Sequence, residues 1–261
     1  MSVLPSPQGT SEKISARSPA LPSSAVQRLV GVEEGYERWA ATYDQYPNPL
    51  IAREERHVAP LLPDLTGKSV LDLACGTGRW LQKLLERGAR LGVGIDNSAA
   101  MLRVAGRKAS IRGQLARADC LQLPFPAAIF DFAICSFALS HIQGLYQAAL
   151  ELGRVMKANA TVVATDLHPE AHQRGWRTGF RDERSAVEIH VHPRSAEGVL
   201  RAFHTAGFEC ISYVSLCLGD AEEAILRRGG KAPMLADACR VPAVLVSWFR
   251  RRDNTAVEGI Q

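Results

Sequence analysis

Residues 70–80 read VLDLACGTGRW, and they carry the strongest indication of the fold. An apolar run typical of a buried strand leads to Asp72, a tight turn holds Gly76 and Gly78, and leucines at helical spacing follow. Because glycine lacks a Cβ atom, such a turn adopts dihedral angles that other residues avoid, and a ligand can approach its backbone closely. The stretch therefore predicts a strand, a ligand-binding turn and a helix, which together begin an α/β sheet.

Downstream of this turn, short apolar runs alternate with helical segments. Ser98 is a candidate cap for a helix that carries Met101, and Gly207 ends a helix over residues 195–206. Strands that alternate with helices, and that are apolar on both faces, predict an α/β domain with a doubly wound, mostly parallel sheet. Seven strands are expected, over residues 69–74, 91–95, 115–118, 130–136, 161–166, 208–216 and 241–249.

The N-terminal residues differ from the rest in composition. Residues 1–24 contain seven serines and four prolines, which favour turns and disorder and predict a flexible tail. An N-terminal helical extension is expected over residues 25–65, with one helix over 26–42 and a second one after it. Residues 25–261 are expected to form a single domain, in which residues 167–194 cover the site as a substrate lid.

Composition and charge narrow the class of protein. The chain of 261 residues has a net charge of +4, its basic residues form only short clusters, and it has no apolar run of about 18 residues. These features predict no membrane span and no nucleic-acid partner. The N-terminus also lacks an apolar signal segment, and the six cysteines are scattered without paired spacing. We therefore expect a cytoplasmic protein with reduced, mostly buried thiols and no zinc site.

Acidic residues accompany three consecutive predicted strands. Asp72 precedes the glycine turn, and Asp96 and Asp119 end the second and third strands. In open α/β sheets, the carboxyl ends of the strands line the crevice that binds ligands. Each carboxylate alone is as well explained by a helix cap or a turn, but three in register with the glycine turn favour a ligand site.

The charge of the turn indicates the kind of ligand. Asp72 would repel a pyrophosphate at the helix N-terminus, whereas it suits a ligand with an amine and a sulfonium group. Leu81 also stands where the nicotinamide pattern G-x-G-x-x-G requires its third glycine. Asp96 is placed to accept hydrogen bonds from ribose hydroxyls, and Asp119 from an adenine amine. The pattern therefore favours a cationic, phosphate-free nucleoside over a dinucleotide.

Together, these residues resemble the class I S-adenosylmethionine-dependent methyltransferases, in the small-molecule branch that includes the ubiquinone and menaquinone C-methyltransferases. The resemblance covers about residues 36–166 and rests on the segments VLDLACGTGRW, GIDNSAAML, ARADCLQLPF, FDFAICSFALSHI and LGRVMKANATVV, in family order and spacing. It implies a Rossmann-like fold and S-adenosyl-L-methionine as the cofactor. The cofactor-binding residues that it implies are Tyr43, Asp72, Ala74, Gly76, Thr77, Gly78, Asp96, Met101, Asp119, Cys120 and Ser136.

The resemblance also implies a role for each part of this set. The turn after the first strand would hold the methionine part of the cofactor. Asp96 and Met101 would flank the ribose and adenine, Ser136 would lie near the methyl group, and Tyr43 would lie over the cofactor. Asp119 and the neighbouring cysteine would contact the adenine.

Two positions depart from the family pattern. Ala74 replaces the first glycine of the turn, which we expect to cost little. Residues 158–160 replace a Pro-Gly-Gly turn before the fifth strand. Asn159 tolerates a left-handed conformation, so the turn geometry is expected to survive.

Candidate acceptor-side residues are histidines and aromatics. Five of the seven histidines fall within residues 168–204, after the fifth predicted strand. His168, Trp176 and His190 are candidate substrate residues, and the alternative for this segment is a polar lid edge with solvated imidazoles. His141, just after the fourth strand, is a candidate general base, although the same position equally suits capping or packing. No regular spacing of histidines and carboxylates supports a metal site.

We predict an S-adenosylmethionine-dependent methyltransferase that acts on a small molecule, with alignment of the reactants as the main catalytic effect. Three alternatives remain. The first is a nucleic-acid or protein methyltransferase. Against it, the sequence has no concentrated basic face, and residues 136–139 stand where such enzymes have an Asn/Asp-Pro-Pro-aromatic tetrapeptide. A non-catalytic cofactor-binding module is the second, and a nicotinamide oxidoreductase, disfavoured by Leu81 and Asp72, is the third. No pattern indicates the identity of the acceptor or the oligomeric state.

Overall fold

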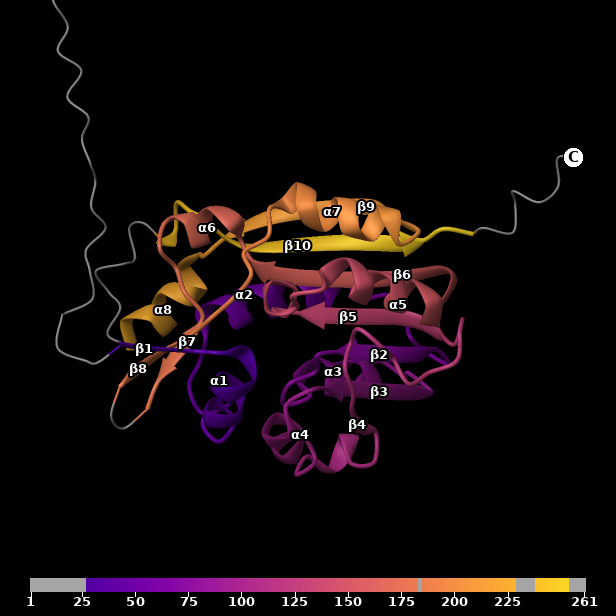
Figure 1. The fold of residues 1–261 in the computed structure, drawn as a ribbon, viewed down its shortest axis with the longest axis horizontal. Coiled ribbons are helices and arrows are strands. Elements are labelled where there is room, and N and C mark those ends of the chain that lie inside the picture. The colour runs from indigo at the N-terminus through magenta and orange to yellow at the C-terminus, as the bar shows by residue number, and fades with distance from the viewer. Residues whose placement is uncertain (1–26, 183–184, 229–237, 254–261) are drawn as a thin grey trace, which may run out of the picture.

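The computed structural model describes residues 27–182, 185–228 and 238–253 (Figure 1). The tail predicted for residues 1–24 lies outside them. In this part of the chain the main sheet has seven strands in the order β4-β3-β2-β5-β6-β10-β9. All pair in parallel except β10, which runs antiparallel to both neighbours. The predicted doubly wound, mostly parallel seven-stranded sheet is therefore confirmed. The strands are β2 (Ser69–Leu73), β3 (Leu91–Asp96), β4 (Leu115–Arg117), β5 (Phe130–Ser136), β6 (Met156–Leu167), β9 (Phe208–Cys217) and β10 (Pro242–Arg251).

Successive side chains of the central strands pack on opposite faces of the sheet, because strand side chains alternate in direction. Leu71 belongs to a buried cluster with α5 (Leu145–Val155) and α7 (Ala196–Thr205). Its neighbour Val70 belongs to the opposite cluster, with α2 (Pro49–Val58), α3 (Arg79–Glu86) and α8 (Asp220–Arg228). Every residue of β2 is buried. Helices on both faces explain why the central strands read as continuous apolar runs.

The single helix predicted over residues 26–42 is wrong. Instead, the strand β1 (Gln27–Val30) precedes the helix α1 (Val32–Trp39), with Gly31 in an extended conformation between them. The strand β1 pairs in parallel with β8 (Ala186–Ile189), which pairs antiparallel with β7 (Gly179–Arg181). The pairing with a distant strand supplies β1 with hydrogen-bond partners that its own sequence does not reveal. Within β1, Val30 is buried, whereas Leu29 is 60% exposed.

Several local expectations are confirmed. Ser98 caps α4 (Ala99–Ala105), because its hydroxyl accepts a hydrogen bond from the Met101 N–H at 3.2 Å. Asn159 adopts the expected left-handed conformation, with φ of 61°. The thiols are less buried than predicted, since only Cys75 and Cys135 are fully buried. No helix within the described ranges is long and apolar enough to cross a membrane.

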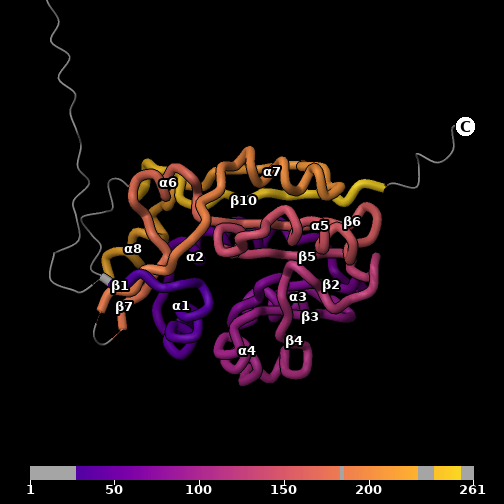
Figure 2. Tube along the Cα trace, in the orientation of Figure 1, coloured from indigo at the N-terminus to yellow at the C-terminus, as the bar shows by residue number. Residues whose placement is uncertain are grey.

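The small sheet of β1, β8 and β7 lies at the end of the main sheet toward which β5 and β6 point (Figure 1). In Figure 2 the N-terminal segment, in indigo, lies beside the orange segment that follows β6. A short helix, α6 (Pro169–Gln173), starts that segment. The arrangement holds α1 close to the carboxyl ends of the parallel strands, where α/β sheets bind their ligands.

Candidate active site

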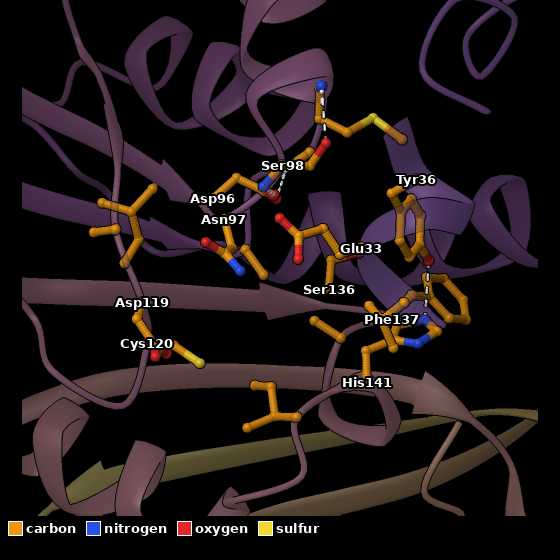
Figure 3. A pocket seen from close by; sticks show the side chains of 18 of the residues that line it. Glu33, Tyr36, Asp96, Asn97, Ser98, Asp119, Cys120, Ser136, Phe137 and His141 are labelled. Carbon is orange, nitrogen blue, oxygen red and sulfur yellow. Dashed lines mark hydrogen bonds between the residues drawn. The ribbon is translucent and has the colours of Figure 1, made fainter. Parts of the chain in front are cut away.

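A cavity of about 290 Å³ lies at the carboxyl ends of β2, β3, β4 and β5. The turns that follow these strands form its floor and sides, and α1 contributes Glu33 and Tyr36 (Figure 3). Of the residues that the sequence predicted for the cofactor, eight line this cavity. They are Tyr43, Ala74, Gly76, Asp96, Met101, Asp119, Cys120 and Ser136.

The glycine turn lies between β2 and α3 and has a left-handed backbone. Ala74, Gly76 and Gly78 have φ angles of 56°, 54° and 77°. A Cβ atom on Gly76 would meet nothing within 4 Å, so the turn presents open space on the cavity side. At Gly78 a Cβ atom would lie 2.3 Å from Cδ1 of Ile111, so any other residue there would have to displace this buried side chain. Ala74 adopts the same left-handed conformation without glycine's freedom.

Asp96 connects β3 to this turn. Its two carboxylate oxygens accept hydrogen bonds from the backbone N–H groups of Gly76 and Ser98, both at 2.8 Å. Burial raises the pKa of Asp96, and these two N–H groups oppose the shift because they favour the charged form. Each carboxylate oxygen has a further lone pair. Asp96 therefore both fixes the turn and keeps acceptor capacity for hydroxyl groups of a ligand.

Three of the predicted cofactor residues do not line the cavity. Asp72 is buried beneath the turn, where its carboxylate accepts the N–H of Leu81 at 2.8 Å. Burial raises the pKa of Asp72 to about 7. The hydroxyl of Thr77 donates to Asp44 at 2.8 Å, and Gly78 is the N-cap residue of α3. In this structure these three residues stabilise the turn without lining the cavity.

The helix α1 is attached to α4 through Glu37. One carboxylate oxygen of Glu37 accepts from the N–H of Ala100 at 2.9 Å and from the hydroxyl of Ser98 at 3.1 Å. The hydrogen bond from Ala100 contributes most to a lowered pKa of Glu37, which keeps the carboxylate charged. A charged acceptor at a helix N-terminus is favourable, because it satisfies N–H groups that lack partners within the helix.

The sequence patterns did not indicate Glu54, which lies next to the cavity wall at Ser136. Glu54 is fully buried, and its carboxylate accepts the hydroxyl hydrogen of Ser136 at 2.6 Å. It also accepts from the Thr165 hydroxyl at 2.6 Å and pairs with Arg79 at 2.6 Å. Arg79 in turn donates to the Ser136 oxygen at 3.1 Å. The Ser136 hydroxyl hydrogen therefore points away from the cavity.

His141, the candidate base, lies in the cavity wall at the end of a 3-10 turn (Leu139–His141). Its Nε2 atom is 2.9 Å from the hydroxyl oxygen of Tyr36, and its Nδ1 atom is enclosed with no hydrogen-bond partner within the described ranges. Burial lowers the pKa of His141 to about 4. The imidazole is therefore neutral at pH 7.

The candidate substrate residues do not line the cavity. His168 caps α6 through Nδ1, and its Nε2 lies 3.0 Å from the Ser215 hydroxyl. Trp176 packs against the apolar cluster of α2 and α3. The backbone N–H of His190 donates to Val30 in β1 at 2.8 Å, and its ring meets His192 edge-on.

Instead of lining the cavity, the segment after β6 holds the turn that carries His141. Arg194 donates to the carbonyl oxygens of Ile142 and Gln143 at 2.7 and 2.8 Å. The N–H of His192 donates to the carbonyl oxygen of Ser140 at 2.7 Å. The sequence predicted that this segment lies next to the site, but it did not indicate which of its residues contact the site.

Neither metal nor thiol chemistry is indicated at the site. No group of three or more His, Cys, Asp or Glu residues in the described ranges is arranged to hold a metal ion. Burial raises the pKa of Cys120 to about 12, so its thiol stays protonated. A protonated thiol is a poor nucleophile.

Comparisons with known proteins agree with this geometry. A family described as a methyltransferase domain matches residues 70–159. A demethylmenaquinone methyltransferase from Thermus thermophilus is 37% identical over 45% of this chain and 55% of its own. One from Bacillus licheniformis is 28% identical over 55% of this chain and 64% of its own. The chain thus spans less than two thirds of the length of these curated relatives.

A solved structure shows the same fold. An S-adenosylmethionine-dependent methyltransferase from Mesorhizobium loti superposes with a TM-score of 0.61 and 24% identity. The alignment covers 77% of this chain and all of that one. Residues 70–159 thus match a methyltransferase domain, and the fold is the one seen in a solved S-adenosylmethionine-dependent methyltransferase.

Proposed function

We propose that the protein transfers a methyl group from S-adenosyl-L-methionine to a small-molecule acceptor. The observation that carries this proposal is the cavity at the strand ends, in which Asp96 couples the left-handed glycine turn to β3. Relatives named demethylmenaquinone methyltransferase support an acceptor that is a small molecule. A nucleic-acid substrate has less support, because every charged side chain that lines the cavity is acidic among the residues that the structure describes.

The donor set fits a cationic nucleoside. The open space beside Gly76 would take the methionine part, and the remaining lone pairs of Asp96 would accept the ribose hydroxyls. Met101 and Cys120 would border the adenine, with Asp119 at the rim, and Tyr43 would cover the cofactor. When bound, the cofactor supplies an activated methyl group and a neutral leaving group.

The residues of this chain contribute mainly by binding, aligning and excluding water. Alignment of two reactants removes most of the entropy cost of a bimolecular step. The helix α1 covers the cavity, and the small sheet together with Glu37 holds the helix in place. The described residues of the predicted lid, 167–182 and 185–194, thus act by supporting α1 and the 139–143 turn.

The role of His141 follows from its hydrogen bond. A general base needs a free lone pair within reach of the acceptor proton. Both nitrogens of His141 are engaged or enclosed, so the residue acts on an acceptor only through Tyr36.

The proposal also includes a cytoplasmic location and no obligatory metal. All six cysteines are free thiols, and free thiols are typical of a reducing compartment. Methyl transfer from a sulfonium needs no metal, because the leaving group is already activated.

Calorimetric titration with S-adenosylmethionine and S-adenosylhomocysteine tests the cofactor site. Asp96→Ala is expected to weaken binding by about 10- to 100-fold, since it removes a charged hydrogen-bond acceptor. Asp64→Ala is the control, because Asp64 is exposed, does not line the cavity and accepts hydrogen bonds from Thr66. Equal affinities for the wild type and Asp96→Ala would contradict the site. Transfer of a labelled methyl group to a panel of acceptors then tests the reaction, and binding without any turnover would favour a non-catalytic module.

A further inference from the structure

Tyr36 and His141 form a pair that spans the wall of the cavity. The helix α1 brings Tyr36 over the strand ends, and the 3-10 turn after β5 brings His141 to meet it. The two rings are arranged edge-on with centroids 5.2 Å apart, and the hydroxyl oxygen lies 2.9 Å from Nε2 (Figure 3). Both side chains line the cavity.

The protonation state of the pair follows from its surroundings. Burial lowers the pKa of His141 to about 4 and raises the pKa of Tyr36 well above its usual value. At neutral pH the pair is therefore a neutral imidazole with one N–H and a phenol with one O–H. Either the imidazole N–H or the phenol O–H is the donor in the hydrogen bond between the two side chains.

The surroundings of the enclosed Nδ1 atom of His141 indicate which of the two groups is the donor. Nδ1 of His141 has no acceptor or donor beside it in the described part of the chain. An enclosed N–H without an acceptor is rarer in proteins than an enclosed lone pair. The hydrogen of the imidazole therefore belongs on Nε2, which donates to the Tyr36 oxygen.

This arrangement leaves the hydroxyl hydrogen of Tyr36 available. Within the described ranges, His141 is the only hydrogen-bond partner of the Tyr36 hydroxyl, and the side chain borders the cavity. We propose that Tyr36 donates a hydrogen bond to an oxygen of an uncharged methyl acceptor, and that His141 is the positioning residue that turns the hydroxyl hydrogen toward it. The inference rests on the proposed methyl transfer and deepens it.

The charges around the cavity support an uncharged acceptor. Glu33, Asp96 and Asp119 border it, and no lysine or arginine is among the described residues that line it. From these described side chains, an anionic acceptor would meet carboxylates and no lysine or arginine that compensates its desolvation. A carbonyl or hydroxyl oxygen instead finds a neutral donor in Tyr36. No proton is transferred between the acceptor and the pair in this arrangement.

The position of the imidazole hydrogen is measurable without any ligand. Nitrogen-15 NMR of the full chain with labelled histidines distinguishes a protonated Nε2 from a protonated Nδ1, and His141→Ala identifies the signal. We expect the hydrogen on Nε2 at pH 7. A hydrogen on Nδ1 would overturn the proposal, because Tyr36 would then donate to His141.

Binding of a matched pair of probes tests the acceptor. The protein is loaded with S-adenosylhomocysteine and titrated with 2-acetylnaphthalene, an uncharged ketone, and with 2-naphthoate, its anionic counterpart. We expect the ketone to bind at least 10-fold more tightly than the anion. Tyr36→Phe is expected to weaken ketone binding about 3- to 10-fold, the range for one neutral hydrogen bond.

The control is Tyr146→Phe, which removes the same hydroxyl from an exposed tyrosine on α5 that does not line the cavity. Unchanged ketone binding in Tyr36→Phe, no ketone binding, or equal binding of the anion would each overturn the proposal. If S-adenosylhomocysteine itself does not bind, the proposed function fails. The NMR measurement still decides the hydrogen placement in that case.

Discussion

The carboxylate of Glu54 is fully buried and lies 2.6 Å from the guanidinium of Arg79. Its remaining partners are the hydroxyls of Ser136 and Thr165 and the indole N–H of Trp80. One carboxylate thus ties α2 to α3, β5 and β6. Removing one partner of a buried ion pair leaves the others without compensation, which costs more than the pair itself contributes.

Glu54→Ala is therefore expected to destabilise the protein by about 3 kcal/mol or more, because it removes the buried partner of Arg79 and the acceptor of two buried hydroxyl groups. The free energy of unfolding from chemical denaturation measures this. Glu55→Ala is the matched control, since Glu55 pairs with the same arginine but is partly exposed. Its expected cost is below about 1 kcal/mol. Similar losses in the two variants would show that the buried network contributes little.

The sequence predicted the parts of the fold whose signals are local. Each of these signals lies within about ten residues of sequence. They are the apolar runs of β2 and β5, the turn at residues 74–78 and the Ser98 cap. Parallel strands buried on both faces leave few arrangements, so the sheet could be predicted from the alternation of strands and helices.

The parts that were missed depend on distant partners. Glu54 sits in the segment REERH, which reads as a solvated helix face. Its partners Arg79, Ser136 and Thr165 lie 25, 82 and 111 residues away. The strand β1 likewise needs β8, more than 150 residues downstream. No local pattern encodes such contacts.

Asp72 should make stability depend on pH between about 4 and 7. Burial raises its pKa from the usual 3.8 to about 7, so in this window the folded state holds a proton that the unfolded state has lost. The contribution of Asp72 to stability therefore falls as pH rises, by up to about 1.4 kcal/mol per pH unit. Asp72→Asn keeps an oxygen to accept the Leu81 N–H but cannot titrate, so it should flatten this slope.

Denaturation midpoints measured from pH 4 to pH 7.5 test the role of Asp72. Asp166, whose pKa burial raises to about 6, adds a slope of the same sign that should persist in the variant. Asp64→Asn is the control, because backbone hydrogen bonding from Thr66 lowers the pKa of Asp64 and moves its effect below this window. An identical slope in Asp72→Asn and the wild type would assign the pH dependence elsewhere.

The turn at Gly78 should be more sensitive to substitution than its φ angle alone implies. A left-handed alanine costs about 1–2 kcal/mol, and a Cβ atom there would also lie 2.3 Å from the Ile111 side chain. Overpacking adds about 1–3 kcal/mol, so Gly78→Ala is expected to lose roughly 3 kcal/mol in denaturation experiments.

Gly113 separates the two effects at Gly78. Its φ is 84°, but a Cβ atom would meet nothing within 4 Å. Gly113→Ala should therefore lose only the cost of the left-handed backbone, about 1–2 kcal/mol. Equal losses at both glycines would mean that Ile111 moves aside without cost.

The attachment of α1 to the small sheet should depend on Gly35. A Cβ atom at this position would lie 2.6 Å from Cγ1 and 2.8 Å from Cδ1 of Ile189 in β8. Alanine favours the helix by up to about 1 kcal/mol, but it forces α1 and β8 apart. Gly35→Ala should therefore loosen the pairing of β1 with β8, and the His190 N–H that donates to Val30 should exchange faster with solvent.

Hydrogen exchange of that amide measures the loosening, and Gly31→Ala is the control because a Cβ atom there meets nothing within 4 Å. Exchange in Gly31→Ala should match the wild type. Since α1 carries Tyr36 over the cavity, Gly35→Ala should also weaken the contact between Tyr36 and His141. Unchanged protection of His190 in Gly35→Ala would show that Ile189 adopts another rotamer, and that the helix is held by Glu37 and α4 instead.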